Sequence, residues 1–208
     1  IKSIILSQPA APLTLSTSKT DVICFNSITG TARANVSGGT PGYTYLWSPS
    51  GGATQSITRG VGTYTVSVTD INGCASAPPS ASATIVQPAN SLNITTSKTN
   101  VTPCFGSANG SVNAKVTGGW GSYTYLWSNG KTTSSMKGLA AGTYSISVRD
   151  GLGCIKTVSV VITQPAQVTA TFSQAGNQLT AIGAGGTPPY TYEWNTFSTA
   201  NPITVSTG

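Results

Sequence analysis

Cysteines and acidic residues are the side chains with reactive groups in this 208-residue sequence, which contains no histidine. Without histidine, the usual general base near neutral pH is missing. The acids lie far apart in sequence, so no two are spaced to flank one bond as in a glycosidase; they are Asp21, Asp70, Asp150 and Glu193. No Gly-x-Ser-x-Gly sequence marks a nucleophilic serine. The sequence therefore predicts a non-catalytic protein.

The four cysteines form two pairs: Cys24 and Cys74 return about 80 residues later as Cys104 and Cys154. No Cys-x-x-Cys spacing and no histidine is present to complete a zinc site, so we expect neither a metal nor a cofactor. A domain of this size has a small core and gains stability from a covalent link. One pair per repeat predicts the disulfides Cys24–Cys74 and Cys104–Cys154, and hence an oxidising compartment.

A ten-residue phrase also recurs, at Gly38 to Trp47, Gly118 to Trp127 and Gly185 to Trp194, and a Gln-Pro dipeptide closes each repeat. Self-similarity at a fixed period is typical of an array. The predicted organisation is the last strand of a preceding repeat at residues 1–7, complete repeats at 8–86 and 87–163, and a partial, cysteine-free variant repeat at 164–208.

Composition predicts an all-β protein made of tandem immunoglobulin-like β-sandwich repeats in an elongated array. Short segments rich in Thr, Val, Ile and Tyr are separated by Gly, Pro and Asn, and no segment has helical periodicity. The net charge is +6, but the basic residues are scattered, so we expect no nucleic-acid partner. No apolar run reaches 18 residues, so we expect no membrane span.

The repeated aromatic residues are interpreted as structural. Trp47, Trp127 and Trp194 occupy the same place on a central strand and are expected in the core, with carbohydrate stacking as the alternative. Tyr64 and Tyr144 follow a Gly-Thr turn, where a hydroxyl commonly bonds to nearby backbone.

Trp120 is the aromatic residue outside this pattern, since its counterparts are Thr40 and Thr187. It lies in a Gly-rich turn and is a candidate surface contact, with local packing as the alternative.

Asp70 and Asp150 each precede a short turn that leads to the second cysteine of the repeat. An Asp carboxylate can accept the N–H of the residue two positions later and so form the turn. The alternative is a calcium site between repeats, although calcium prefers several clustered oxygen ligands.

The combined pattern resembles the SprB repeat. It reads Gly-Gly-x-x-x-Tyr-x-Tyr-x-Trp-Ser, then Leu-x-Ala-Gly-Thr-Tyr-x-Ile-x-Val-x-Asp-x-x-Gly-Cys, then Ile-Thr-Gln-Pro, most clearly from Cys104 to Pro165. The resemblance implies a large surface adhesin of gliding bacteria, exported by the type IX secretion system and located outside the cell. It implies no catalytic residue.

Two functions remain open at this point. In the first, the repeats form a stalk that holds an adhesive region away from the cell. Its partners are neighbouring repeats and the gliding or surface-anchoring machinery. In the second, each repeat binds surface glycans weakly and many repeats act together. The turn after Gly-Gly differs between repeats, as Thr40-Pro41, Trp120-Gly121 and Thr187-Pro188, which favours the stalk.

Overall fold

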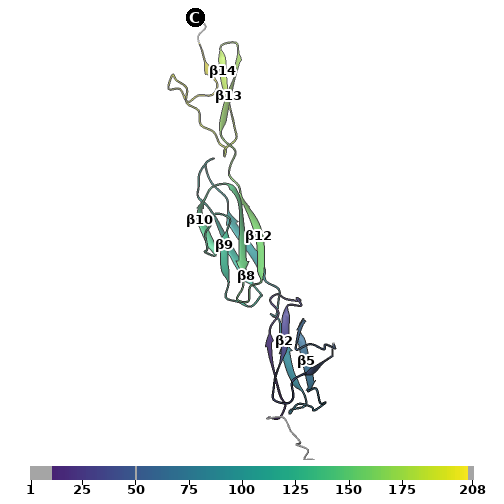
Figure 1. The fold of residues 1–208 in the computed structure, drawn as a ribbon. Helices are drawn as coiled ribbons and strands as arrows, with labels where there is room; N and C mark the ends of the chain where they lie inside the picture. Colours follow the sequence, from purple (N-terminus) through teal and green to yellow (C-terminus); the bar gives the residue numbers. More distant parts are fainter. Residues whose placement is uncertain (1–10, 50, 206–208) are drawn as a thin grey trace, which may run out of the picture. The chain divides into compact units, whose positions relative to one another are not determined.

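The computed structural model describes residues 11–49 and 51–205, and its regular secondary structure there is β-strand (Figure 1). The all-β prediction is confirmed. Strand β5 (Gly62–Thr69) illustrates why these segments form strands, since Tyr64, Val66 and Val68 alternate with Thr and Ser and are the buried positions. Within the described ranges, no helix is long and apolar enough to cross a membrane.

The first repeat consists of two three-stranded antiparallel sheets. One sheet has the order β1-β2-β4, from Thr14–Thr20, Gly30–Ser37 and Ser56–Arg59; the other has the order β3-β5-β6, in which β3 is Thr44–Ser48 and β6 is Ala81–Ile85. Residues of both sheets share one core cluster, which makes the pair a sandwich; Ala32 and Ala34 come from β2, and Trp47 and Val66 from the facing sheet.

The second repeat has the same arrangement. Its sheets have the orders β10-β8-β7 and β12-β11-β9; the bounds are Asn93–Thr99 for β7, Gly110–Thr117 for β8, Thr124–Trp127 for β9, Ser135–Leu139 for β10, Gly142–Arg149 for β11 and Ile155–Ile162 for β12. The burial pattern of β8 equals that of β2 residue for residue. Equal patterns indicate that the two repeats bury equivalent positions.

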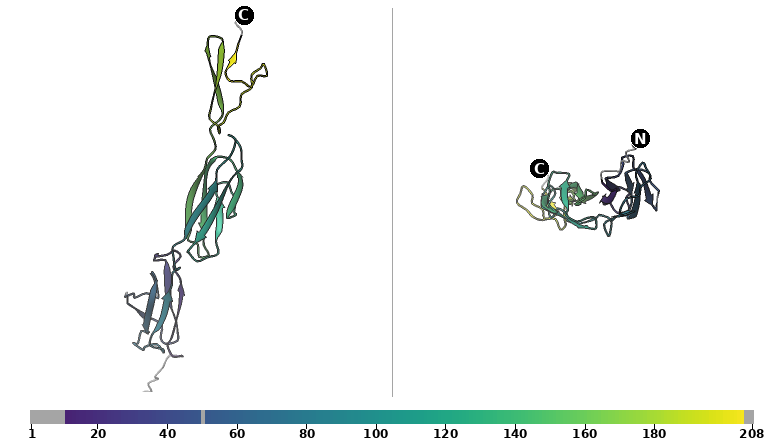
Figure 2. Two further views of the ribbon diagram at one scale, coloured as in Figure 1. Left: turned by 180° about the vertical axis from the view of Figure 1, so that it is seen from behind. Right: turned by 60° about the horizontal axis from the view of Figure 1, so that its bottom comes forward.

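The segment after Gln164 differs, because its described residues form a single sheet of order β13-β14-β15. A long hairpin joins β13 (Thr169–Ala175) to β14 (Gln178–Ala184), and β15 (Ile203–Thr204) adds a short edge (Figure 2). Every residue of β13 is exposed. The described part of this segment therefore supplies no second sheet to cover β13.

Contacts between Cα atoms divide the chain into two compact units. The first comprises Ile1–Asn93 together with Thr117–Tyr123 and Arg149–Ile155, and the second comprises Ile94–Val116, Thr124–Val148 and Lys156–Gly208. Two turns of the second sequence repeat thus group with the first repeat. The predicted strand at residues 1–7 lies outside the described residues, and the predicted repeat boundaries remain predictions.

Candidate functional site: the loops joined by Cys24 and Cys154

The repeated tryptophans lie at equivalent positions and make equivalent hydrogen bonds. Trp47 and Trp127 are only 1% and 2% exposed, while Trp194 is half-buried. Each indole Nε1–H donates to a backbone carbonyl oxygen six or seven residues later, at 2.9 Å to Thr54, 2.8 Å to Thr133 and 2.9 Å to Ala200. Trp47 and Trp127 lie in the core as expected, whereas Trp194 does not. All three indole N–H groups are bonded to backbone and are not free for a ligand.

Tyr64 and Tyr144 also bond to nearby backbone. The Tyr64 hydroxyl donates to the Gly60 carbonyl oxygen at 3.2 Å, and the Tyr144 hydroxyl donates to the Ala140 carbonyl oxygen at 3.1 Å. In both repeats the acceptor lies four residues before the tyrosine. The bond holds the turn that precedes strands β5 and β11.

Asp70 organises the turn after β5. This turn (residues 70–76), together with the hairpin residues 38–43 that it contacts, is here called the aspartate turn. The Asp70 carboxylate accepts the N–H groups of Asn72 and Cys74 on Oδ1, at 3.0 and 2.9 Å, and that of Thr40 on Oδ2 at 3.0 Å. The pKa of the Asp70 carboxyl lies below its ordinary value. The largest cause is the hydrogen bond from the Thr40 N–H, and the other N–H donors add to it, so together they favour the charged form more than burial opposes it.

Two glycines allow this carboxylate to come so close to the preceding hairpin. Gly38 and Gly39 have φ angles of 74° and 64°, which favour glycine. A Cβ atom on Gly39 would lie 3.2 Å from Oδ2 of Asp70, and one on Gly38 would collide with the Pro12 carbonyl oxygen. The repeated Gly-Gly is thus required by the aspartate turn.

Asp150 forms the second aspartate turn (residues 150–154 with 118–123) in the same way. Its Oδ1 accepts the N–H groups of Leu152, Gly153 and Cys154 at 3.2, 3.0 and 2.9 Å, and its Oδ2 accepts the N–H of Trp120 at 3.0 Å. The predicted role of both aspartates in making the turn is confirmed by these bonds.

These carboxylates are occupied by backbone donors in both turns. Across residues 11–49 and 51–205, no group of three or more His, Cys, Asp or Glu side chains is placed to hold a metal ion. Both aspartates accept N–H groups and so have a structural role. The reactive side chains of these turns are their cysteines.

The predicted bridge between Cys24 and Cys74 is wrong, because strand β5 separates the two residues. Cys74 follows the C-terminal end of β5. Cys24 lies at the other end, where β6 pairs with the start of β5 and the Val22 N–H donates to the Val86 carbonyl oxygen at 3.2 Å. The eight residues of β5 make seven steps of about 3.3 Å, so its ends are about 23 Å apart. A disulfide requires Cα atoms within about 7 Å.

The structure instead joins Cys24 to Cys154, with a Cα–Cα distance of 5.2 Å. The predicted bridge Cys104–Cys154 is therefore wrong as well, and Cys74 and Cys104 are free and exposed. The disulfide links residues 130 positions apart in sequence. The prediction of disulfides within each repeat was wrong because it relied on the number of cysteines per repeat. It did not consider at which end of a strand each cysteine lies.

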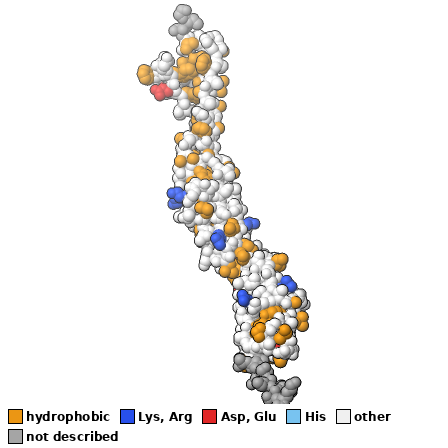
Figure 3. Space-filling model, in the orientation of Figure 1, with side chains coloured by type: hydrophobic (Ala, Val, Ile, Leu, Met, Phe, Trp, Pro, Cys, Tyr) orange, Lys and Arg blue, Asp and Glu red, His pale blue; other side chains and the backbone are white. Residues whose placement is uncertain are grey.

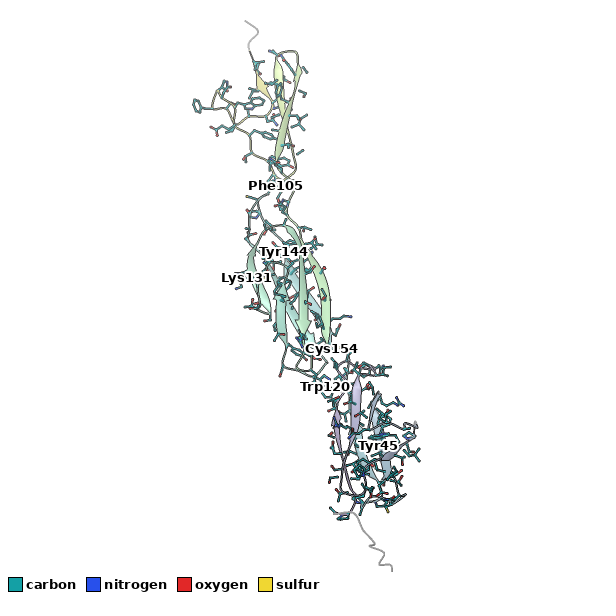
Figure 4. All side chains as sticks on the ribbon, in the orientation of Figure 1. Tyr45, Phe105, Trp120, Lys131, Tyr144 and Cys154 are labelled. Atoms are coloured by element: carbon teal, nitrogen blue, oxygen red, sulfur yellow. A yellow bond between two sulfur atoms is a disulfide. The ribbon has the colours of Figure 1, made fainter. Side chains whose placement is uncertain are left out.

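Trp120 contacts the same loop as Cys154 does (Figure 4). Its indole is half-buried, and its Nε1–H donates to the carbonyl oxygens of Val22 at 2.9 Å and Ile23 at 3.1 Å. These two residues directly precede Cys24. One hydrogen-bond donor and one disulfide therefore hold the second aspartate turn against the segment that carries Cys24.

That segment, here called the cysteine loop (residues 21–29, with 101–109 as its counterpart), is shaped by the glutamine of the Gln-Pro dipeptide. The Gln87 side chain accepts the N–H of Asn26 at 3.1 Å, and the Gln164 side chain accepts the N–H of Gly106 at 3.0 Å. Asn26 and Gly106 both have positive φ, at 59° and 78°. Asn and Gly tolerate this conformation, which explains their exchange between repeats.

Sequence reasoning missed two of these contacts. Gln87 and Gln164 marked only a boundary, although the recurrence of glutamine before the boundary proline was a signal for a structural role. The acceptors of the Trp120 indole gave no signal, since they lie 97 and 98 residues earlier in the chain and are backbone atoms.

Paired three-stranded antiparallel sheets around a buried tryptophan, present twice, define this protein as a tandem array of small immunoglobulin-like sandwiches. The family model of the SprB repeat matches residues 16–52 and 95–132, which confirms the resemblance in these two segments. No curated protein sequence matches the chain.

Among solved structures, the chain is similar to the crystal structure of the N-terminal eight Ig domains of Down Syndrome Cell Adhesion Molecule (DSCAM) isoform 1.30.30. The identity is 11% and the TM-score is 0.32. The similarity covers 73% of this chain and 25% of that one, so it spans about a quarter of the DSCAM structure.

Proposed function

We propose that this chain is a non-catalytic stalk segment of a large repetitive cell-surface adhesin, which spaces an adhesive region from the cell during gliding or surface attachment. The match to the SprB repeat in two segments supports a surface adhesin repeat region. The location outside the cell and export through the type IX secretion system are part of the proposal, and the Cys24–Cys154 disulfide is consistent with an oxidising environment.

One observation carries the stalk function: polar groups of several kinds of repeated residue are bonded within the protein's own framework. The repeated tryptophans, the turn tyrosines Tyr64 and Tyr144, the turn aspartates and the glutamines of the Gln-Pro dipeptides bond to backbone; examples are Trp47 to Thr54, Tyr64 to Gly60 and Gln87 to Asn26. A binding array would instead repeat exposed groups with free donors and acceptors. What recurs is the framework of a sandwich, as a spacer requires.

The surface supports the same function. Lysine and arginine side chains lie singly among uncharged ones on the face drawn in Figure 3. In the whole sequence only 7% of residues are charged. A surface of this kind has no strong field that would attract a charged ligand.

The alternative, a multivalent binding array, has one feature in its favour, which is a repeated exposed leucine. Leu46 and Leu126 occupy the same position in strands β3 and β9 and are 65% and 56% exposed. An apolar side chain that is exposed in both repeats is a candidate contact for many weak bonds acting together.

The test compares beads coated with the full chain and beads coated with its Leu46→Ser and Leu126→Ser double variant on a glycan array and on glass under flow. We expect the same retention for both, and no more than for uncoated beads. Retention on specific glycans that disappears in the double variant would overturn the pure stalk. Circular dichroism of both proteins provides the control for folding.

A further inference from the structure

Two complementary loops meet at the Cys24–Cys154 disulfide, and the chain contains a second copy of each that is not joined. The cysteine loop at 101–109 presents Cys104, and the aspartate turn at 70–76 presents Cys74. Both of these cysteines are exposed, whereas Cys24 and Cys154 are half-buried. The unjoined copies therefore show more of their thiol side chains to solvent than the joined ones.

The two cysteine loops share two internal hydrogen bonds after the cysteine, so this part of the free copy is already shaped for the same contact, whereas before the cysteine the Thr102 carbonyl oxygen accepts the Asn109 side-chain amide. In each loop a glutamine accepts the N–H two residues after the cysteine. In each loop a serine N–H donates back to the cysteine carbonyl oxygen, at 3.0 Å from Ser27 to Cys24 and at 3.4 Å from Ser107 to Cys104.

The phenylalanine after each cysteine separates the joined loop from the free one. Phe25 is half-buried, whereas Phe105 is 50% exposed. On the free aspartate turn, Ile71 is exposed as well. Each unjoined element thus has one large exposed apolar side chain near its free cysteine in sequence, as the joined turn has at Leu152. Covering such side chains on association is favourable.

We propose that these surfaces bind each other between molecules: the cysteine loop of Cys104 in one copy receives the aspartate turn of Cys74 from a second copy, and the two cysteines form a disulfide. The surfaces are different, so the contact is heterologous. Each copy still has one free surface of the opposite kind after pairing, which allows head-to-tail chains of copies.

The bond forms by thiol–disulfide exchange with a small-molecule disulfide as oxidant, such as oxidised glutathione. The Cys74 thiolate attacks one glutathione sulfur and releases a glutathione thiolate, which takes up the proton that Cys74 lost. The Cys104 thiolate of the second copy then attacks the Cys74 sulfur of this mixed disulfide and releases the second glutathione. Two protein thiols are oxidised, and one glutathione disulfide is reduced to two thiols.

The test uses two variants of the 208-residue chain, Cys74→Ser and Cys104→Ser, each of which retains one kind of free cysteine. Each is incubated alone and as an equimolar mixture in a glutathione redox buffer, and the products are separated without reduction and mapped by mass spectrometry. We expect dimers in the mixture that contain Cys74 joined to Cys104, at least tenfold more than in either variant alone.

Two results would overturn the proposal. One is that all three samples remain monomeric. The other is that the symmetric bonds Cys74–Cys74 and Cys104–Cys104 form in the single-variant samples as readily as the mixed bond forms in the mixture. The maps must also retain Cys24–Cys154, since exchange of that bond would change the surfaces under test.

A third variant tests whether the joint resembles the one in the structure. Thr40 occupies the place of Trp120, and its side chain lacks the indole N–H that bonds to the cysteine loop. A Thr40→Trp change in the Cys104→Ser protein should raise the dimer yield with Cys74→Ser several-fold. Thr40→Phe, which adds a ring without the N–H, is the matched control, and an equal yield from both would contradict this geometry.

Discussion

The aspartates of the two turns accept hydrogen bonds in a similar pattern, but the surroundings of the turns differ. Asp70 and Asp150 each accept N–H groups from their own turn and from the hairpin 30 residues earlier. Among their sequence differences, Thr40 of the first turn stands where the second has Trp120, and Cys74 is free whereas Cys154 is bonded. The comparison shows that hydrogen bonds within one repeat are enough to form the turn. Attachment of the turn to a cysteine loop depends in addition on the Trp120 indole and on the Cys154 sulfur.

Removal of the disulfide should have the largest effect on this comparison. A Cys24→Ser and Cys154→Ser double variant should lose up to about 5 kcal/mol of unfolding free energy in the chain-entropy model for a closed loop of this length. Urea denaturation followed by tryptophan fluorescence measures the loss. Without the disulfide, the second aspartate turn should lack a covalent link to a cysteine loop, as the first aspartate turn does.

The matched control is the Cys74→Ser and Cys104→Ser double variant, in which both free thiols are changed. Its unfolding curve should coincide with that of the original protein. A similar loss in both double variants would mean that the pairing described here is not the one that stabilises the protein.

The aspartates test the shared part of the two turns. Asp150→Ala should cost about 3 kcal/mol, because several N–H groups lose a charged acceptor in a buried place. Asp70→Ala should also lower the unfolding midpoint. Thermal unfolding measures both, and an effect confined to Asp150 would show that the first turn does not depend on its carboxylate.

Acid should weaken the first turn through Asp70. Its pKa is lowered from the ordinary value of 3.8, so its stabilisation is complete above that value and is lost as the pH falls through the lower folded pKa. Melting temperatures between about pH 2 and pH 6 should therefore decrease on the acid side, and less steeply for Asp70→Asn.

Asp21 also makes the stability of the protein fall in acid, so its contribution must be separated from that of Asp70. Burial opposes its charged form, but hydrogen bonds from Lys19 and from the Val86 N–H lower its pKa overall. The Asp70→Asn change is therefore best measured in an Asp21→Asn background. An unchanged slope there would contradict the role given to Asp70.

Trp120→Phe isolates the feature that the first turn lacks. The ring is kept, but the carbonyl oxygens of Val22 and Ile23 lose their indole donor, which should cost about 1 kcal/mol. Chemical denaturation measures this cost. Because the first turn has no such donor, Thr40→Ser should be close to neutral, and it serves as the control.

The smallest effect is expected at Asn26. Its φ of 59° suits glycine, which stands at the equivalent position 106, so Asn26→Gly should change stability by no more than about 0.5 kcal/mol. Asn26→Val, with a branched side chain in a left-handed conformation, should cost more than the glycine. Equal costs would indicate that the Gln87 contact alone determines the loop.

Much of the fold was predictable because it depends on local patterns. Alternation in segments such as β5 specifies strands, and the repeated Trp, Tyr and Gly identify equivalent positions without knowledge of the pairing partners. The turn built by Asp70 was predictable for the same reason, since its nearest acceptor–donor pair is two residues apart.

The site was less predictable, because it depends on which ends of the strands come together. Cys24 is the first cysteine of one repeat and Cys154 is the second cysteine of the next, so a pattern read within one repeat does not pair them. The two cysteines of the first repeat lie at opposite ends of β5, which prevents the pairing within the repeat. The acceptors of Trp120 are backbone oxygens and have no sequence signature.

The Cys24–Cys154 bond closes a covalent ring through most of the two complete repeats. A ring must be cut twice before a piece can leave. A single proteolytic cut between these two cysteines would leave both fragments attached, so the chain would keep its two ends connected after damage that would sever an open chain.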